Sequence, residues 1–234
     1  MRHRFPCSLF FAALVLALQG CTGLYFHKAA HSPPPPRPVV LSDNTIREYW
    51  TGIVFNGSKI GFSHFRLASA AEEENRFDIQ SEAHFRIRFL MLDKKINLRG
   101  FDRVADDVSL IRFDYSFDLD GNHLSLNGQR SANQLVVTVR SREESTPQVI
   151  SLETQIYPAS AIALYPFLNG LEVGRRYQYT VYDGQTQKLA PVDQVILAYE
   201  ESELFRGPAF KIRTQFQGRT VTTWMNDRGE PLLE

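Results

Sequence analysis

The chain has 234 residues, of which 43% are hydrophobic, enough to bury the core of a globular domain. Lysine plus arginine and aspartate plus glutamate both number 26, so the formal net charge is zero. This balance argues against a nucleic-acid-binding protein, which needs a basic surface to replace counterions along the phosphates.

The N-terminal segment reads as an export signal. Arg2 and Arg4 precede an apolar run over Ser8–Leu18, which closes on Leu18-Gln19-Gly20-Cys21. The run is shorter than the ~20 apolar residues of a membrane-spanning helix, and no Ala-x-Ala-like site of an ordinary secretory signal follows it. The closing sequence resembles a bacterial lipobox, in which the cysteine is acylated and becomes the first mature residue. We therefore predict a signal peptide over residues 1–20 and lipidation of Cys21.

Several acyl chains on Cys21 would hold the protein on a membrane, because a single chain binds only reversibly. Thr22 stands where aspartate commonly signals retention in the inner membrane, which predicts the outer membrane, facing the periplasm. Residues 21–45 include His31-Ser32 and a proline run over 33–38, which favours an extended tether. Cys7 is the only other cysteine, so the mature protein is expected to have no disulfide and no thiolate nucleophile.

Residues 46–234 are predicted to form a single β-rich domain. Residues 76–89, 111–119 and 210–216 each alternate apolar with polar side chains, as half-buried strands do. Turn signals separate such runs: Asn56-Gly57, Glu73-Glu74-Asn75, Asp120-Gly121-Asn122, Ser131-Ala132-Asn133 and Asp183-Gly184. The predicted fold is mainly β, a large curved antiparallel sheet or incomplete barrel of about ten strands. Periodicity leaves a β-sandwich open as an alternative.

Two local features stand out within this pattern. The apolar phase slips after Ile60 and Phe62, which predicts a β-bulge near Gly61 to His64. Residues 158–168 place apolar side chains nearly on one side, which predicts one short helix ending at Gly170.

Three sequence pieces carry a family resemblance. They are Trp50-x-Gly52-Ile53-x-x-Asn56-Gly57-x-Lys59-Ile60-Gly61-Phe62-Ser63-His64, Gly170-Leu171-x-Val173-Gly174-x-x-Tyr177 and Thr222-x-Trp224-Met225-Asn226-Asp227-x-Gly229. In this order they resemble a β-rich region found N-terminal to bacterial transglutaminase-like domains. Such an enzyme needs a cysteine, a histidine and an aspartate, and the mature chain offers no free cysteine. The resemblance thus implies the accessory region without the catalytic core, either acting alone or left by a gene that lost its catalytic half.

Candidate catalytic and metal-binding residues each have a plainer interpretation. Ser63 and His64 are adjacent on a strand, so their side chains point to opposite faces. His64 and His84 could approach each other on neighbouring strands but lack a third zinc ligand, and His123 and His27 have no partners close in sequence. The run over residues 118–122 has the wrong spacing for an EF-hand calcium loop, and Asp102, Asp106 and Asp107 suggest a solvated acidic loop. We therefore predict no catalytic residue, no metal and no cofactor.

The remaining candidates concern binding. Arg86 with Arg88, and Arg175 with Arg176, could bind lipid phosphates or cell-wall carboxylates, although a charged outer face is the simpler interpretation. The 17 phenylalanines could line a lipid-sized cavity or fill a dry core. We expect a non-catalytic periplasmic domain that binds a protein partner or a cell-envelope component. The alternative is a carrier or sensor of a hydrophobic ligand.

Overall fold

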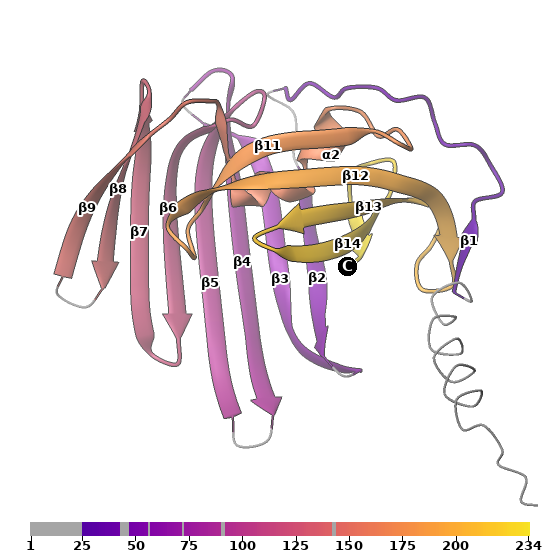
Figure 1. The fold of residues 1–234 in the computed structure, drawn as a ribbon. Helices are drawn as coiled ribbons and strands as arrows, with labels where there is room; N and C mark the ends of the chain where they lie inside the picture. Colours follow the sequence, from indigo (N-terminus) through magenta and orange to yellow (C-terminus); the bar gives the residue numbers. More distant parts are fainter. Residues whose placement is uncertain (1–24, 43–46, 56, 72, 90–91, 142–143) are drawn as a thin grey trace, which may run out of the picture.

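The computed structural model describes residues 25–42, 47–55, 57–71, 73–89, 92–141 and 144–234. Its described residues form fifteen strands in two open sheets, with one short α-helix, so the prediction of a mainly β, incompletely closed fold is confirmed (Figure 1). The predicted signal peptide and Cys21 lie outside the described residues. Among the described residues, no helix combines the length and apolarity that crossing a membrane requires.

The larger sheet is an eight-stranded antiparallel meander in which each strand pairs with the next. Its strands are β2 (Arg47–Phe55), β3 (Ser58–Ser69), β4 (Arg76–Phe89), β5 (Leu92–Ala105), β6 (Leu110–Leu119), β7 (Asn122–Ser131), β8 (Gln134–Ser141) and β9 (Glu144–Ser151). The alternation predicted β4 and β6 closely. The turns predicted at residues 73–75, 120–122 and 131–133 are confirmed, with Asp120 and Ala132 at positive φ, whereas Asn56 lies outside the described residues.

The smaller sheet has seven strands and lies across part of the larger one (Figure 1). Its strands are β1 (Phe26–Lys28), β10 (Ile156–Pro158), β11 (Arg176–Asp183), β12 (Lys188–Ser202), β13 (Ala209–Phe216), β14 (Arg219–Met225) and β15 (Pro231–Leu233). All its pairings are antiparallel except β10 with β11. The helical segment predicted at 158–168 consists of a 3₁₀ turn η2 (Ala159–Ala163) and α2 (Tyr165–Leu168), and Gly170 follows at positive φ.

The core fills the space between the sheets. Phe77 and Ile79 of β4 are at most 1% exposed, as are Phe210 and Ile212 of β13. One buried cluster joins β3–β5 to the smaller sheet and α2, and a second joins β6–β8 to β10 and Tyr182. Most aromatic residues on the inward faces therefore belong to a packed core, as aromatic side chains at strand spacing commonly do.

The bulge predicted near Gly61 to His64 lies slightly earlier in β3. The register between β2 and β3 shifts between Ile53 and Val54, so Ile60, the residue before Gly61, has no cross-strand partner on β2. From Gly61 to the end of β3 the register with β4 is unbroken. The change in apolar phase after Phe62 reflects the outward position of that residue. The side chain of Phe62 is 37% exposed on the outer face, with its ring 5.5 Å from that of Trp50.

The start of β2 and the turn before β15 meet at Phe167 of α2. The Arg47 guanidinium of β2 lies 3.9 Å from the centroid of the Phe167 ring and donates a hydrogen bond to the carbonyl of Arg228. Gly229 has a φ of 77°, and a Cβ there would lie 2.5 Å from the same ring. A glycine is thus required at this position both for its backbone conformation and for the close approach to Phe167.

The segment predicted as a tether is partly folded onto the domain. β1, within residues 21–45, pairs with β12, and Ala29 N donates to the Tyr199 carbonyl. Residues 33–38 have no regular secondary structure and are exposed, but Val39 N donates to the Leu168 carbonyl and Leu41 is buried. Contacts with the two sheets thus begin well before the predicted domain boundary at residue 46.

Candidate functional site

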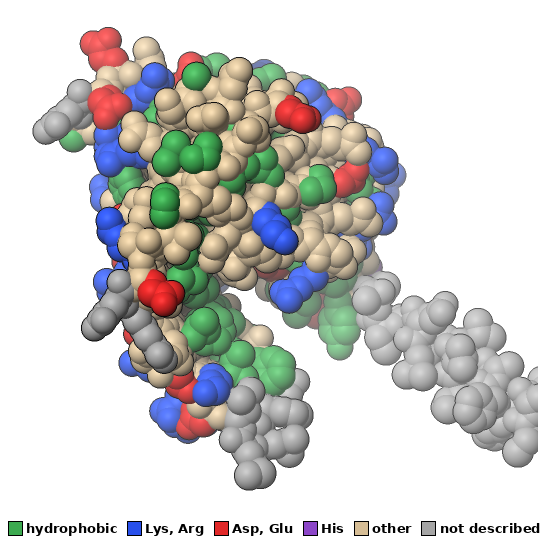
Figure 2. Space-filling model, turned by 60° about the vertical axis from the view of Figure 1, so that its left-hand side comes forward, with side chains coloured by type: hydrophobic (Ala, Val, Ile, Leu, Met, Phe, Trp, Pro, Cys, Tyr) green, Lys and Arg blue, Asp and Glu red, His purple; other side chains and the backbone are tan. Residues whose placement is uncertain are grey.

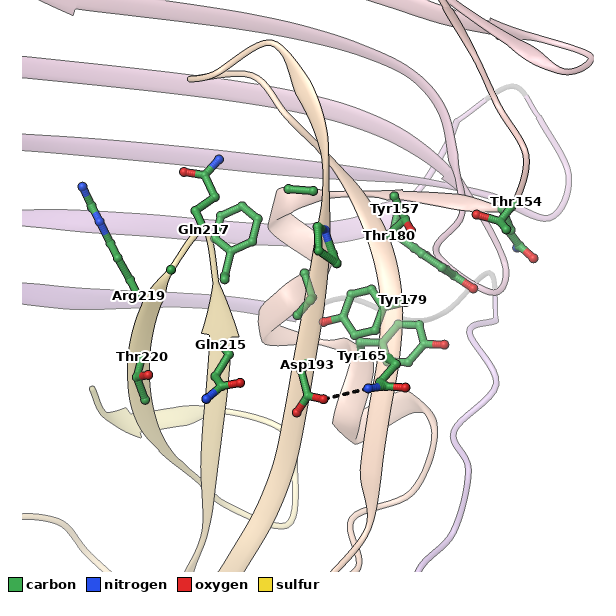
Figure 3. A pocket seen from close by; sticks show the side chains of 17 residues that line it. Thr154, Tyr157, Tyr165, Tyr179, Thr180, Asp193, Gln215, Gln217, Arg219 and Thr220 are labelled. Carbon is green, nitrogen blue, oxygen red and sulfur yellow. Dashed lines mark hydrogen bonds between the residues drawn. The ribbon is translucent and has the colours of Figure 1, made fainter.

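A pocket with a volume of about 900 Å³ lies at the end of the smaller sheet where β13 turns into β14 (Figure 3). It is lined by residues of β10 to β14, of the segment before β10 and of the first turn of α2. Aromatic rings, amides and hydroxyls dominate its lining. The residues that bear them are Thr154, Gln155, Tyr157, Tyr165, Gln178, Tyr179, Thr180, Gln215, Phe216, Gln217 and Thr220, with Asp193 and Arg219 as the charged members.

Strand register sorts the lining residues onto two faces of the sheet. Tyr179, Val192, Phe216 and Arg219 are successive cross-strand partners, and so share one face. Gln178, one residue before Tyr179, lies on the opposite face. Its successive cross-strand partners there are Asp193, Gln215 and Thr220. The aromatic groups and the arginine of the pocket therefore belong to the same side of the sheet.

Three tyrosines form one end of the pocket. The Tyr165 and Tyr179 rings stack with centroids 3.9 Å apart, and the Tyr157 ring meets both edge-on, at 5.1 and 5.6 Å. Burial raises the pKa of Tyr157 and that of Tyr179 well above the ordinary tyrosine value. Both hydroxyls therefore stay protonated at neutral pH and can donate hydrogen bonds.

A buried amide holds the tyrosine group in place. Gln194 of β12 is 2% exposed and accepts a hydrogen bond of 2.6 Å from the Tyr179 hydroxyl. Its own amide nitrogen donates to the Ile162 carbonyl and to Thr214 Oγ1, at 3.1 and 2.9 Å. Because these contacts reach both η2 and β13, the wall of the pocket is positioned from behind rather than by residues facing solvent.

The charges in the pocket are distributed unequally. Asp193 accepts a hydrogen bond of 2.9 Å from Gln178 and lies 3.9 Å from the Arg176 guanidinium, so a neighbouring cation offsets its charge. Arg219 has no ion-pair partner among the described residues. Figure 3 shows Arg219 and Gln217 at the end of the pocket opposite the tyrosines. The pocket thus combines an aromatic end with an uncompensated cation.

A buried carboxyl group lies deeper between the sheets. Asp102 of β5 is 1% exposed and accepts hydrogen bonds of 2.5 Å from the Tyr115 hydroxyl and 2.6 Å from Ser160 Oγ. Burial raises the pKa of Asp102 to about 6, although the two hydrogen bonds oppose that change. The expectation that Asp102 belongs to a solvated acidic loop with Asp106 and Asp107 was therefore wrong for Asp102.

The structure separates the side chains of the candidate catalytic pair. Ser63 Oγ faces inward and shares a hydrogen bond with Thr51. His64 lies on the outer face, stacked on Trp50 at 4.0 Å and bonded to Glu48 at 2.8 Å. Strand alternation predicted this separation, and His64 therefore cannot act as a base for Ser63.

The other candidates also have structural partners. His84 bonds to Asn97 at 3.0 Å, and among the described residues no group of three histidine, cysteine or acidic side chains could hold a metal. Asp118 accepts from Gly121 N at 2.8 Å, as in a hairpin turn. Arg86 forms an ion pair with Asp93 on the exposed face.

The pocket was not among the sites predicted from the sequence. Its aromatic members come from three separate segments, around Tyr157, Tyr165 and Tyr179, so no short motif marks it. The one available signal was the alternation of β11, in which Tyr177 and Tyr179 fall on the inward face.

Comparison with solved structures places the fold among β-barrel-like proteins of unknown function. A β-barrel-like protein of the domain of unknown function DUF1849 from Brucella abortus superposes with a TM-score of 0.52 at 9% identity, over 73% of this chain and 79% of that one. A DUF1089 family protein from Pseudomonas aeruginosa gives a TM-score of 0.40 at 11% identity, over 78% of this chain and 93% of that one. No family profile matches the sequence, and no curated protein does. At these identities the likeness to the DUF1849 protein concerns the fold alone.

Proposed function

We propose that this protein is a non-catalytic, lipid-anchored domain of the bacterial cell envelope that binds an acidic glycan of the cell wall. The observation that carries the proposal is the pocket that joins the Tyr157, Tyr165 and Tyr179 rings to the unpaired cation of Arg219. The anchor is the predicted acylation of Cys21, and the domain would correspond to the accessory region of transglutaminase-like proteins that its sequence resembles.

The chemistry of the pocket suits a sugar that carries a carboxylate. The apolar face of a sugar ring can lie against an aromatic ring, while its hydroxyls exchange hydrogen bonds with polar groups such as the Gln217 amide and the Tyr157 hydroxyl, which also line the pocket. A carboxylate can bind a guanidinium through two parallel hydrogen bonds, and Arg219 is available for this. Such a ligand would span the pocket from the tyrosines to Arg219.

Titration calorimetry on the full acylated protein in detergent tests the proposal, with soluble muropeptides as the probe. Arg219→Gln is expected to weaken binding about tenfold or more, since a hydrogen bond to a charged group contributes roughly 1.5–3 kcal/mol. Arg140→Gln on β8, exposed and outside the pocket, is the matched control and should bind like the parent. Equal affinities for the parent and Arg219→Gln would refute the assignment of this pocket.

A neutral chito-oligosaccharide distinguishes the contribution of the tyrosines to binding from that of Arg219. It lacks the carboxylate, so Arg219→Gln should leave its weaker binding unchanged, whereas Tyr157→Ala should reduce the binding of both ligands. If the neutral sugar binds the parent as tightly as the muropeptide does, the ligand is not selected by its charge.

A carrier of a hydrophobic ligand is the second candidate, and one surface favours it. Figure 1 shows β4 and β5 running past the smaller sheet. Their inner faces there carry Phe85 and Ile96, next in register to Leu119, which is 49% exposed. Figure 2 shows hydrophobic side chains gathered beside this protruding end. A stoichiometric lipid extracted from the purified protein, lost in Leu119→Asp, would support the carrier.

A further inference from the structure

The described N-terminal segment is held by the domain at two places. Phe26 of β1 pairs with Ser202 of β12, and its ring stacks on Trp224 with centroids 4.4 Å apart. Farther along, Val39 N donates a hydrogen bond of 2.9 Å to the Leu168 carbonyl. A proline-rich stretch that is fixed at both ends cannot act as a free spacer between the membrane and the domain.

This attachment changes the distance between a lipidated Cys21 and the domain. If residues 22–45 were a free polyproline-like tether, they could extend over roughly 75 Å at ~3.1 Å per residue. With β1 paired to β12, only residues 22–25 separate Cys21 from Phe26, and five residue steps span at most roughly 18 Å. The β1 end of the domain is therefore confined close to the headgroup layer of the bilayer.

The surface at that end has the composition of a membrane-contacting surface. We call it the β1 surface, and it consists of Tyr25, Leu204, Phe205 and Arg206. The Tyr25 side chain is 53% exposed and that of Leu204 is 55% exposed, while the Phe205 ring lies 6.3 Å from that of Phe26. Tyrosine favours the membrane interface, leucine the acyl region and arginine the phosphates.

We propose that the β1 surface lies against the phospholipid bilayer, so that the anchored domain has a fixed orientation with the β12–β13 turn at the membrane. The proposal rests on the acylation of Cys21 that the proposed function includes. Lys28 and Arg206 are balanced by Glu201 and Glu203, so apolar and interfacial contacts, rather than net charge, would hold this surface at the bilayer.

A depth measurement on the full acylated protein tests the proposal. The protein is reconstituted in vesicles of phosphatidylethanolamine and phosphatidylglycerol, and a thiol-reactive fluorophore is attached to Leu204→Cys. In the acylated mature chain this is the only free thiol. Val149→Cys is the control, because Val149 is 59% exposed on β9, which lies opposite β1 (Figure 1).

Nitroxide-bearing lipids are expected to quench the label at residue 204 several-fold more than the label at residue 149, and its emission should shift to shorter wavelength. Equal quenching at the two positions in protein of acylated mass would overturn the orientation while leaving the anchor intact. A mass without acyl chains would instead refute the anchor on which the proposed function depends.

Discussion

Two buried polar side chains, one from each sheet, hold the short helical segment between the sheets. Asp102 of the larger sheet accepts a hydrogen bond from Ser160 of η2, and Gln194 of the smaller sheet donates one to the Ile162 carbonyl of the same turn. Each also binds a tyrosine hydroxyl. The two sites therefore share a geometry and differ in chemistry, since one is an ionisable carboxyl and the other a neutral amide.

The same structural role therefore depends on pH at the carboxyl site and not at the amide site. A neutral amide with all its partners costs little to bury, whereas an ionised carboxylate in the same position loses hydration that its hydrogen bonds replace only in part. The pocket wall depends on the amide side of this pair, because Gln194 also binds Tyr179.

Removing the amide is expected to have the largest effect. Gln194→Ala leaves the Tyr179 hydroxyl, the Ile162 carbonyl and Thr214 Oγ1 without their partner in a buried site, which should lower the free energy of unfolding by roughly 4 kcal/mol. Urea denaturation measures the loss. Gln178→Ala, on the exposed face of β11, should change stability by no more than about 0.5 kcal/mol. Similar values for the two variants would contradict the structural role of Gln194.

Replacing the carboxyl group should reveal the pH dependence. The pKa of Asp102 is about 6 in the folded protein against an ordinary value of 3.8, so between these values the folded state holds a proton that the unfolded state has lost. Stability from this group therefore falls as pH rises through that window, by up to about 3 kcal/mol in total, and stays lower above it. Asp102→Asn keeps a hydrogen-bonding amide without the charge.

The expected result is that Asp102→Asn equals the parent near pH 4 and exceeds it in stability at pH 7. Denaturation of both proteins across this range measures the difference between their free energies of unfolding. The other carboxylates are the same in both proteins, so their contributions cancel in this difference. A parent that is the more stable protein at pH 7 would show that the ionised carboxylate is stabilised in place.

The smallest contrast concerns two tyrosine hydroxyls. The Tyr179 hydroxyl donates to Gln194, whereas the buried Tyr182 hydroxyl has no hydrogen-bond partner among the described residues. Tyr179→Phe should therefore destabilise the protein by about 1 kcal/mol, and Tyr182→Phe should be neutral or slightly stabilising. Thermal unfolding of the pair checks this, and a larger loss in Tyr182→Phe would indicate a partner that the structure does not contain.

Strand alternation made much of the fold predictable. In β4 the apolar residues Phe77 and Ile79 face the core, and the intervening Asp78 forms an ion pair with Arg103 on the outer face. The helical segment was also predictable, because apolar side chains grouped on one side and Gly170 stood at the expected end. These features are local in the sequence, so they can be predicted without knowing which strands pair with one another.

What could not be predicted depends on contacts between distant segments. Periodicity leaves open how many sheets a set of strands forms, and the pairing of β1 with β12 joins residues more than 170 positions apart. Asp102 looked like part of a solvated loop because two further aspartates follow it, yet β5 carries it into the core. The pocket could not be predicted for the same reason, because Tyr157, Tyr179 and Arg219 come from separate strands.

The proposed function can be tested in one experiment by native mass spectrometry of the protein, purified gently from its own membranes and then incubated with a muropeptide digest. We expect a chain that begins at Cys21, carries acyl chains and binds one acidic muropeptide, with that adduct lost in Arg219→Gln. A chain that binds no muropeptide but carries a stoichiometric phospholipid would contradict it and favour the carrier.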